Sequence, residues 1–252
     1  LSRGLGDVYK RQEYNEGVFV GYRYYDKKEM AVRYPFGHGL SYTTFEYSDI
    51  KLSDTAVGDD DILTVNVVIT NTGNCAGKEI VQLYVADKSG FAVRPEKELK
   101  DFIKIELQPG ERKTVTFRLD KRAFSYYNEE LGDWYAPNGK YDIMIASSSR
   151  DIRLTAEVTH KTAVKLPFVA TENTVFGEFM DYAEGKATID LLFSKVAKGL
   201  LGGDHFEPEA VRSMIGSMPL RQIRSFGGIS DELLHQAVDM LNKDFGGFKA
   251  QM

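Results

Sequence analysis

The feature that most constrains the fold is a series of short alternating runs between residues 45 and 160. Ile62 to Thr70 shows the pattern best, because β-branched residues recur at every second position, as in a strand with one buried face. Turn-forming stretches such as Asn71 to Asn74 and Gln108 to Glu111 separate the runs. About seven strands of this kind predict a β-sandwich. The expected strands are Phe45 to Leu52, Ile62 to Thr70, Glu79 to Ala86, Leu99 to Leu107, Lys113 to Leu119, Lys140 to Ala146 and Ile152 to Val158.

A sandwich of this size has the dimensions of an immunoglobulin or fibronectin type III domain. The chain has one Cys and one Trp, so the Cys…Trp…Cys pattern of antibody domains is absent. A true antibody-type domain is therefore not expected.

Two segments precede the sandwich. Leu1 to Gln12 has no initiator Met, no signal-peptide core and no clear periodicity, and we expect residues 1–12 to be a foreign leader. Residues 13–44 are dense in Gly and Tyr; Val18 to Tyr25 predicts a strand, and Pro35 to Gly39 predicts a loop. This segment is too short to form a core, so we expect its aromatic groups to leave an exposed apolar patch.

In residues 161–252 the spacing of apolar residues differs from that of the sandwich. An extended linker around Pro167 is followed by a helical pattern. Leu233, Leu234, Ala237, Val238 and Leu241 lie on one helical face, with Ser230 as the expected N-cap. We predict at least three helices whose apolar stripes pack on each other or on the sandwich. The expected helical segments are Val175 to Tyr182, Ala187 to Leu201, Pro208 to Ile215 and Ser230 to Asn242.

Composition excludes several classes of partner. The formal charge of the chain is −5, without a basic face for nucleic acid or a polybasic run for anionic lipid. Apolar runs such as Val65 to Ile69 are far too short to span a bilayer. Cys75 has no partner for a disulfide, and no His pair has metal-ligand spacing, so we expect no cofactor and no metal. A cytoplasmic location is the expectation.

Candidates for chemistry are sparse. No Gly-x-Ser-x-Gly elbow is present, and His38, His160, His205 and His235 are scattered along the chain. Asp59-Asp60-Asp61 is interpreted as a solvated turn rather than a calcium loop, because the Gly and distal Glu of an EF-hand are missing. Glycoside hydrolysis needs two carboxylates at a set separation, and any two of Glu96, Glu98, Glu129 and Glu130 could form such a pair. The favoured interpretation is that these residues are solvated side chains in loops.

Two groups of aromatic residues have alternative interpretations. The Gly37-His38-Gly39 loop is favoured as a tight turn, and the functional alternative is a docking loop that lines a cleft edge with Phe36, His38 and Tyr42. The favoured interpretation of Tyr126-Tyr127 and Trp134-Tyr135 is that they are core residues, and the alternative is that they form a platform on which a sugar ring stacks.

Several stretches resemble the C-terminal part of glycoside hydrolase family 3, the family of β-glucosidases and β-xylosidases. Their order and spacing match over residues 13–155, and Asp101 departs from the family's usual Gly. The stretches are Glu16 to Asp26 (EGVFVGYRYYD), Tyr34 to Phe45 (YPFGHGLSYTTF), Asn71 to Gly73 with Gly77 to Tyr84 (NTG, GKEIVQLY), Arg94 to Phe102 (RPEKELKDF), and Gln108 to Glu111 (QPGE).

The resemblance implies a fibronectin type III-like sandwich for 45–160. It also implies that 13–44 is the end of an α/β sandwich domain with its connecting loop, and that 161–252 is a linker and helical C-terminal extension. In the family the nucleophilic Asp lies on a barrel in a Ser-Asp-Trp-like motif, and no Ser-Asp pair here is followed by Trp. The acid/base Glu comes from the body of the α/β domain, so no catalytic residue can be carried over to this chain.

We therefore expect a mainly β fold that is the C-terminal fragment of a retaining β-glucosidase-like hydrolase. Its role is scaffold and domain docking, and the fragment alone is predicted to be inactive. The expected partners are a β-glucoside or oligosaccharide substrate of the intact enzyme, the missing barrel and the missing α/β domain. The alternatives are a self-standing carbohydrate- or protein-binding sandwich and an interaction module that assembles through its tail.

Overall fold

The protein is described from a computed structural model that covers residues 16–179, 216–226 and 230–249. The chain forms two compact units. The first contains Leu1–Tyr127 and Trp134–Thr162, and the second contains Asn128–Asp133 and Ala163–Met252. Each unit is described by itself.

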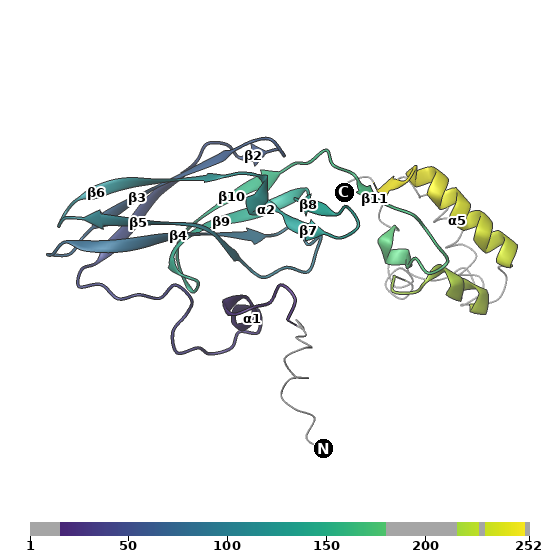
Figure 1. Ribbon diagram of the computed structural model, residues 1–252, viewed down its shortest axis with the longest axis horizontal. Coiled ribbons are helices and arrows are strands. Elements are labelled where there is room, and N and C mark those ends of the chain that lie inside the picture. The colour runs from purple at the N-terminus through teal and green to yellow at the C-terminus, as the bar shows by residue number, and fades with distance from the viewer. Residues whose placement is uncertain (1–15, 180–215, 227–229, 250–252) are drawn as a thin grey trace, which may run out of the picture. The chain divides into compact units, whose positions relative to one another are not determined.

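The first unit is built on a β-sandwich, as the alternation predicted (Figure 1). One sheet has the order β1-β3-β6 and the other has the order β2-β10-β9-β4-β5. Neighbouring strands are antiparallel, except that β2 runs parallel to β10. The strands are β1 (Phe45–Leu52), β2 (Ala56–Val57), β3 (Leu63–Asn71), β4 (Gly77–Asp87), β5 (Glu98–Leu107), β6 (Arg112–Leu119), β9 (Gly139–Ser148) and β10 (Asp151–His160). Helix α2 (Lys121–Phe124) and a hairpin of β7 (Tyr126–Asn128) and β8 (Asp133–Tyr135) lie between β6 and β9.

The core lies between the two sheets. In β3 every second residue from Leu63 to Asn71 is buried, which is the pattern that predicted this strand. Strand β4 differs, because all residues from Val81 to Ala86 are buried. Val81, Leu83 and Val85 face the core, and the opposite face of β4 is covered by residues that precede the sandwich.

Those preceding residues contain α1 (Tyr22–Lys27) where a strand was expected, so that expectation was wrong. The helix begins after Gly21, whose φ of 60° is readily adopted only by glycine. Tertiary contacts then override the strand preference of the aromatic residues, because the Tyr22 hydroxyl accepts a hydrogen bond from the backbone N–H of Leu99 at 2.8 Å. Residues 16–44 share one compact unit with the sandwich, and their origin in an α/β domain stays a prediction.

The second unit has its own small core. It contains the pair β11 (Leu166–Pro167) and β12 (Phe248–Lys249), the 3-10 helices η2 (Phe176–Glu178) and η3 (Leu220–Phe226), and α5 (Asp231–Phe245). The buried residues are Phe168, Ala170, Phe176, Phe179, Leu220, Leu234, Ala237, Leu241 and Phe245.

The helical expectations for this unit are confirmed only in part. Helix α5 has the expected N-cap, since the Ser230 hydroxyl accepts from the N–H of Leu233 at 3.2 Å, and its apolar stripe packs into the core. The helix expected from Val175 is a single 3-10 turn within the described residues. The helices expected at 187–201 and 208–215 lie outside the described residues.

Candidate functional site

The loop that contains Phe36 and Gly37 is hydrogen-bonded to the outer face of the β4 sheet. The buried Gln82 amide donates to the carbonyl oxygens of Gly37 at 3.1 Å and Ser147 at 2.6 Å, and its own oxygen accepts from the Tyr84 hydroxyl at 2.7 Å. The backbone N–H of Ser149 donates to the Phe36 carbonyl at 2.8 Å. Gly37 has a φ of 79°, and a side chain there would overlap the Gln82 amide, so this position requires glycine.

Helix α1 is held by ion pairs as well. The Asp26 carboxylate is almost fully buried and lies 2.8 Å from Nε of Arg150 and 3.1 Å from Nζ of Lys97. Tyr22 stacks on Phe36, with ring centroids 4.6 Å apart. Residues 16–44 therefore have fixed attachments to the sandwich although they have no core of their own.

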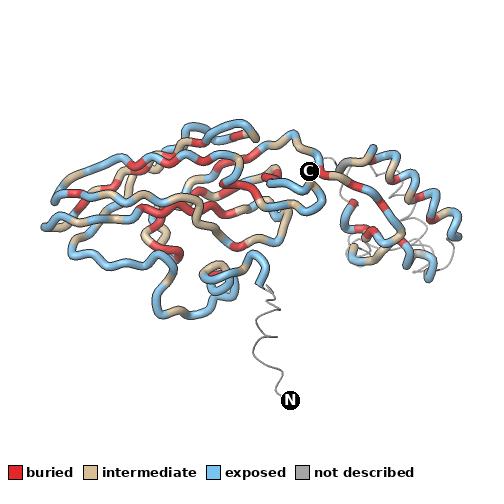
Figure 2. The backbone as a smooth tube through the Cα atoms, viewed as in Figure 1, coloured by how far each residue is buried: buried red, intermediate tan, exposed pale blue. Residues whose placement is uncertain are grey.

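Most of the rest of this segment is exposed, as its colour in Figure 2 shows. Within the described residues, nine of the seventeen exposed large apolar side chains come from this one segment. Contiguous patches of exposed apolar groups are typical of interaction surfaces. We call these side chains the aromatic face: Val18, Val20, Tyr24, Tyr25, Met30, Tyr34, Phe36, Leu40 and Tyr42. The sequence predicts exposure for seven side chains of this segment, and five of the seven are exposed, whereas Phe19 and Tyr22 are half-buried. The seven are Val18, Phe19, Tyr22, Tyr24, Tyr25, Phe36 and Tyr42.

The three cleft-edge candidates do not converge on one site. Phe36 lines a cavity of about 200 Å³ with Tyr22 and Asp26. His38 is exposed and stacks on Tyr34, with ring centroids 5.4 Å apart. Tyr42 is fully exposed. Whether any of these residues touches substrate stays a prediction.

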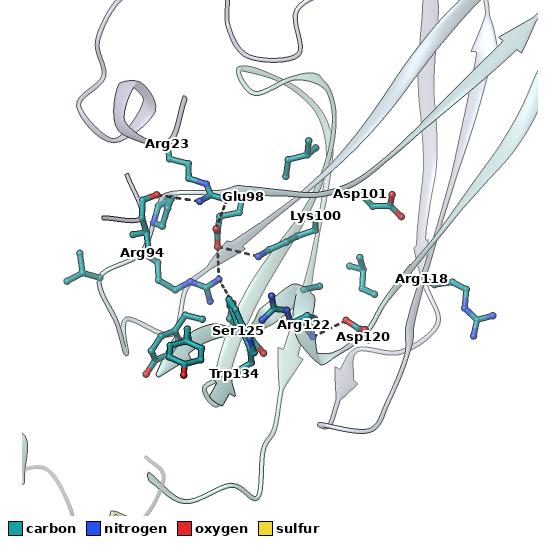
Figure 3. Close-up of a pocket in the computed structure, with 18 residues that line it drawn as sticks. Arg23, Arg94, Glu98, Lys100, Asp101, Arg118, Asp120, Arg122, Ser125 and Trp134 are labelled. Carbon is teal, nitrogen blue, oxygen red and sulfur yellow. Dashed lines mark hydrogen bonds and ion pairs between the residues drawn. The ribbon is translucent and has the colours of Figure 1, made fainter. Parts of the chain in front are cut away.

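A larger cavity of about 560 Å³ lies in the same unit and has Val18 of the aromatic face among its lining residues; we call it the cationic cavity. It is lined by Arg23 of the preceding segment, by Arg94 and Lys100 near the start of β5, and by Arg122 of α2 (Figure 3). Arg94, Glu98 and Lys100 belong to the Arg94 to Phe102 stretch, but Arg23 and Arg122 are separated by about a hundred positions, so sequence patterns did not reveal the cavity.

Glu98 is the centre of this cavity's ion-pair network. Its carboxylate accepts from Arg94 at 2.7 Å and Lys100 at 3.3 Å, and lies 3.1 Å from Nη2 of Arg23. Burial by itself would raise the pKa of Glu98, but the neighbouring cations outweigh burial and hold that pKa below its ordinary value. A carboxyl group that stays ionised is unsuited to be the acid of a glycosidase.

The other carboxylates considered for catalysis are no better placed. Glu96, Glu129 and Glu130 are exposed, as expected of loop positions. The Asp59 to Asp61 turn is not simply solvated, because Asp59 accepts from the Thr162 hydroxyl at 2.6 Å and pairs with Lys121 at 3.4 Å. Among the described residues, no cluster of three or more His, Cys, Asp or Glu side chains has the arrangement of a metal site.

The aromatic residues near β7 and β8 divide between the two interpretations. Tyr135 is buried, and Tyr126 contacts it edge to face with ring centroids 6.0 Å apart. Trp134 is 38% exposed, lines the cationic cavity and has the Arg122 guanidinium over its ring. Tyr135 is therefore core, whereas Trp134 forms part of a cavity wall.

None of the helices within the described part of the chain combines the length and apolar character that crossing a membrane requires.

Comparison with known proteins agrees with this architecture. A family model for the fibronectin type III-like domain matches residues 79–149, which contain most of β4 and all of β5, β6 and β9. The thermostable β-glucosidase B of Acetivibrio thermocellus is 45% identical over 234 residues, which is 92% of this chain and 31% of that protein. The crystal structure of the Bifidobacterium adolescentis glycoside hydrolase family 3 β-glucosidase is 43% identical, with a TM-score of 0.60 over 67% of this chain and 24% of that one.

The chain belongs to glycoside hydrolase family 3.

It spans about a third or less of the length of the family members that it matches. The exo-α-(1→6)-L-arabinopyranosidase of Bifidobacterium breve is also similar, with 45% identity over 66% of this chain and 22% of that protein. The part of this chain that matches these relatives includes its fibronectin type III-like domain. The C-terminal resemblance that the motifs indicated is thereby confirmed.

Proposed function

We propose that this chain is the non-catalytic, domain-docking part of a retaining β-glucosidase-like hydrolase. The observation that supports the proposal is the aromatic face, whose side chains are exposed although its segment is attached to the sandwich through Gln82, Ser149 and Asp26. A segment that is rigid and apolar loses little conformational freedom when a partner covers it. The partner would be the rest of the enzyme, namely a catalytic barrel and an α/β domain.

The reaction proposed for the intact enzyme is the hydrolysis of terminal β-glycosidic bonds in a β-glucoside or oligosaccharide. Two carboxylates would act as nucleophile and acid/base, and neither would come from this chain. Two relatives named for different activities, a β-glucosidase and an arabinopyranosidase, are each 45% identical to this chain. This equal similarity supports a scaffold role, in which the sugar specificity is set elsewhere.

Complementation tests the docking role. The Acetivibrio thermocellus enzyme is expressed without the region that matches this chain, and this chain is then added as a separate protein. We expect the addition to raise hydrolysis of an aryl β-glucoside and to produce a complex in analytical ultracentrifugation. The double variant Tyr24→Ser and Tyr25→Ser removes two exposed rings of the aromatic face and should abolish both effects.

The matched control is Ile62→Ser, which removes an exposed apolar side chain outside the aromatic face and should leave complementation unchanged. A chain that hydrolyses the glucoside by itself would overturn the proposal. Equal complementation by the Tyr24/Tyr25 double variant would also overturn the assigned docking surface.

A further inference from the structure

The wall of the cationic cavity carries a charge opposite to that of the whole chain. Five cations and three carboxylates line it, which is a formal charge of +2 in a chain whose total is −5. Arg118 and Asp101 point away from the inner cluster in Figure 3, and removing this pair leaves the excess at +2. Local potential of one sign in a cavity concentrates ligands of the opposite sign.

Arg23, Arg94 and Lys100 all interact with one carboxylate, that of Glu98. The Arg94 guanidinium also donates hydrogen bonds to Asp87 and to the carbonyl oxygens of Phe124 and Ser125. Lys100 and Arg23 both depend on the same Glu98 carboxylate.

Lys100 shows the consequence of this crowding. Its side chain is only 16% exposed, and burial, assisted by the nearby Arg94 and Arg23, lowers its pKa despite the attraction of Glu98. The ammonium group has three N–H donors, and among the described residues only the Glu98 carboxylate accepts a hydrogen bond from it. A further anion beside Lys100 would relieve the repulsion and accept the remaining hydrogen bonds.

The opposite wall of the cavity is aromatic. Trp134 lines it together with Tyr127, whose ring meets the indole edge to face at a centroid distance of 5.6 Å. The Arg122 guanidinium lies over the same indole ring. Aromatic surfaces pack against the apolar C–H faces of sugar rings, so this wall complements a ring rather than a bare ion.

We propose that the cationic cavity binds a carboxylate carried on a sugar ring, such as a uronate residue. Lys100 and Arg122 would receive the carboxylate, and Trp134 and Tyr127 would contact the ring. The volume of about 560 Å³ lies within the roughly 300–1,000 Å³ typical of small-molecule sites. This site is separate from the catalytic reaction, and its test does not depend on the docking role.

Trp134 is the only Trp of the chain, so its fluorescence reports on the cavity directly. The full chain is titrated at low salt with glucuronate, glucose and acetate. We expect a saturable change with glucuronate, at least a tenfold weaker response to acetate, and no saturable response to glucose. Absence of saturation by glucuronate would overturn the proposal. An equal response to acetate would overturn the sugar component, and an equal response to glucose would overturn the role of charge.

Variants locate the site, with binding measured by calorimetry so that changes near Trp134 do not alter the signal. Lys100→Met should weaken glucuronate binding at least tenfold. Lys104→Met is the matched control, because Lys104 is an exposed lysine of the same strand that does not line the cavity, and binding should be unchanged. Arg122 is exposed, so Arg122→Met should fold even where Lys100→Met does not, and it should also weaken binding. Binding unaffected by Arg122→Met would overturn the proposed site.

Discussion

Arg150, in the turn between β9 and β10, forms an ion pair with Asp26 of α1, 124 residues earlier in the chain. The Nε to Oδ1 distance is 2.8 Å, and the carboxylate is only 6% exposed. Lys97 lies 3.1 Å from the other carboxylate oxygen. One buried acidic residue therefore links the segment that carries the aromatic face to two separate parts of the sandwich unit.

We predict that Asp26→Asn loosens residues 16–44 without unfolding the sandwich. Removing one partner of a fully buried ion pair costs about 3–5 kcal/mol, and the one-third exposure of Arg150 should place this variant below that range. Trypsin should then cleave after Lys27 and Lys28 much faster, as measured by mass spectrometry. Glu157→Gln removes an exposed pair with Lys140 and should leave cleavage unchanged. Equal cleavage of Asp26→Asn and the unmodified chain would contradict the clamp.

We predict that Gly37→Ala costs more stability than Gly90→Ala. Both glycines have φ near 70–80°, so each variant incurs roughly 1–2 kcal/mol of backbone strain. Only at Gly37 would the new methyl group overlap the Gln82 amide and disturb its hydrogen bonds, each worth about 1 kcal/mol. Urea unfolding of the two variants measures the difference. Equal free energies of unfolding would show that Gln82 moves aside freely.

We predict that the Glu79 carboxyl group makes the folded chain less stable as pH rises above the acidic range. Burial raises the pKa of this carboxyl, while the hydrogen bond from the Tyr47 hydroxyl at 2.6 Å opposes the shift. The folded state therefore holds the proton more tightly than the unfolded state. Its stabilising effect is complete below the ordinary value of 4.5 and is lost as pH rises through the higher folded pKa.

Glu79→Gln should consequently be more stable than the unmodified chain at neutral pH, with no such gain near pH 3. Thermal unfolding across this range measures the effect. A gain that is independent of pH would indicate better packing rather than removal of a buried charge.

For His160 we predict the opposite pH dependence, in which the folded chain loses stability as pH falls. It is fully buried beside Phe124 and Tyr141, and burial lowers its pKa despite the Asp59 carboxylate at 3.9 Å. The unfolded state therefore binds the proton more readily, and this contribution to stability falls as pH drops below the ordinary value of 6.5 toward the folded pKa. His160→Gln should flatten the slope of stability against pH between 7 and 5. His38→Gln, at an exposed position, should keep the slope; an unchanged slope in His160→Gln would assign it to other groups.

We predict that the purified chain hydrolyses neither aryl β-glucosides, aryl β-xylosides nor cellobiose above background. Glycosidases need an acid and a second carboxylate around one bond, and losing either removes most of the rate. Glu98 is held ionised by its cations, and the other three loop glutamates are exposed. Chromogenic product release at high protein concentration measures this. Activity that disappears on changing Glu96, Glu98, Glu129 or Glu130 to Gln would place a catalytic pair in this chain.

Local sequence by itself determined the seven long strands of the sandwich and helix α5, but not the two-residue strand β2. Alternation from Leu63 to Asn71 identifies β3, because in a two-layer sandwich each strand buries every second residue. Ser230 likewise marks the start of α5, since an N-cap hydroxyl acts within a few residues of the helix end. The helix continues to Phe245, beyond the expected end at Asn242, and stops at the left-handed Gly246. Such signals are readable because cause and effect are neighbours in the chain.

Tertiary structure alone decided the features that concern function. Val18 to Tyr25 has the composition of a strand, yet Tyr22–Lys27 is helical because Leu99, Phe36 and Arg150 supply its contacts from distant positions. The cationic cavity and the pairing of Asp59 with Thr162 have the same origin. Charges and hydrogen-bonding groups gain their roles from partners within a few ångströms. Arg94 and Lys100 are close to Glu98 in the sequence, but Arg23 lies tens of residues away, where no local pattern records the contact.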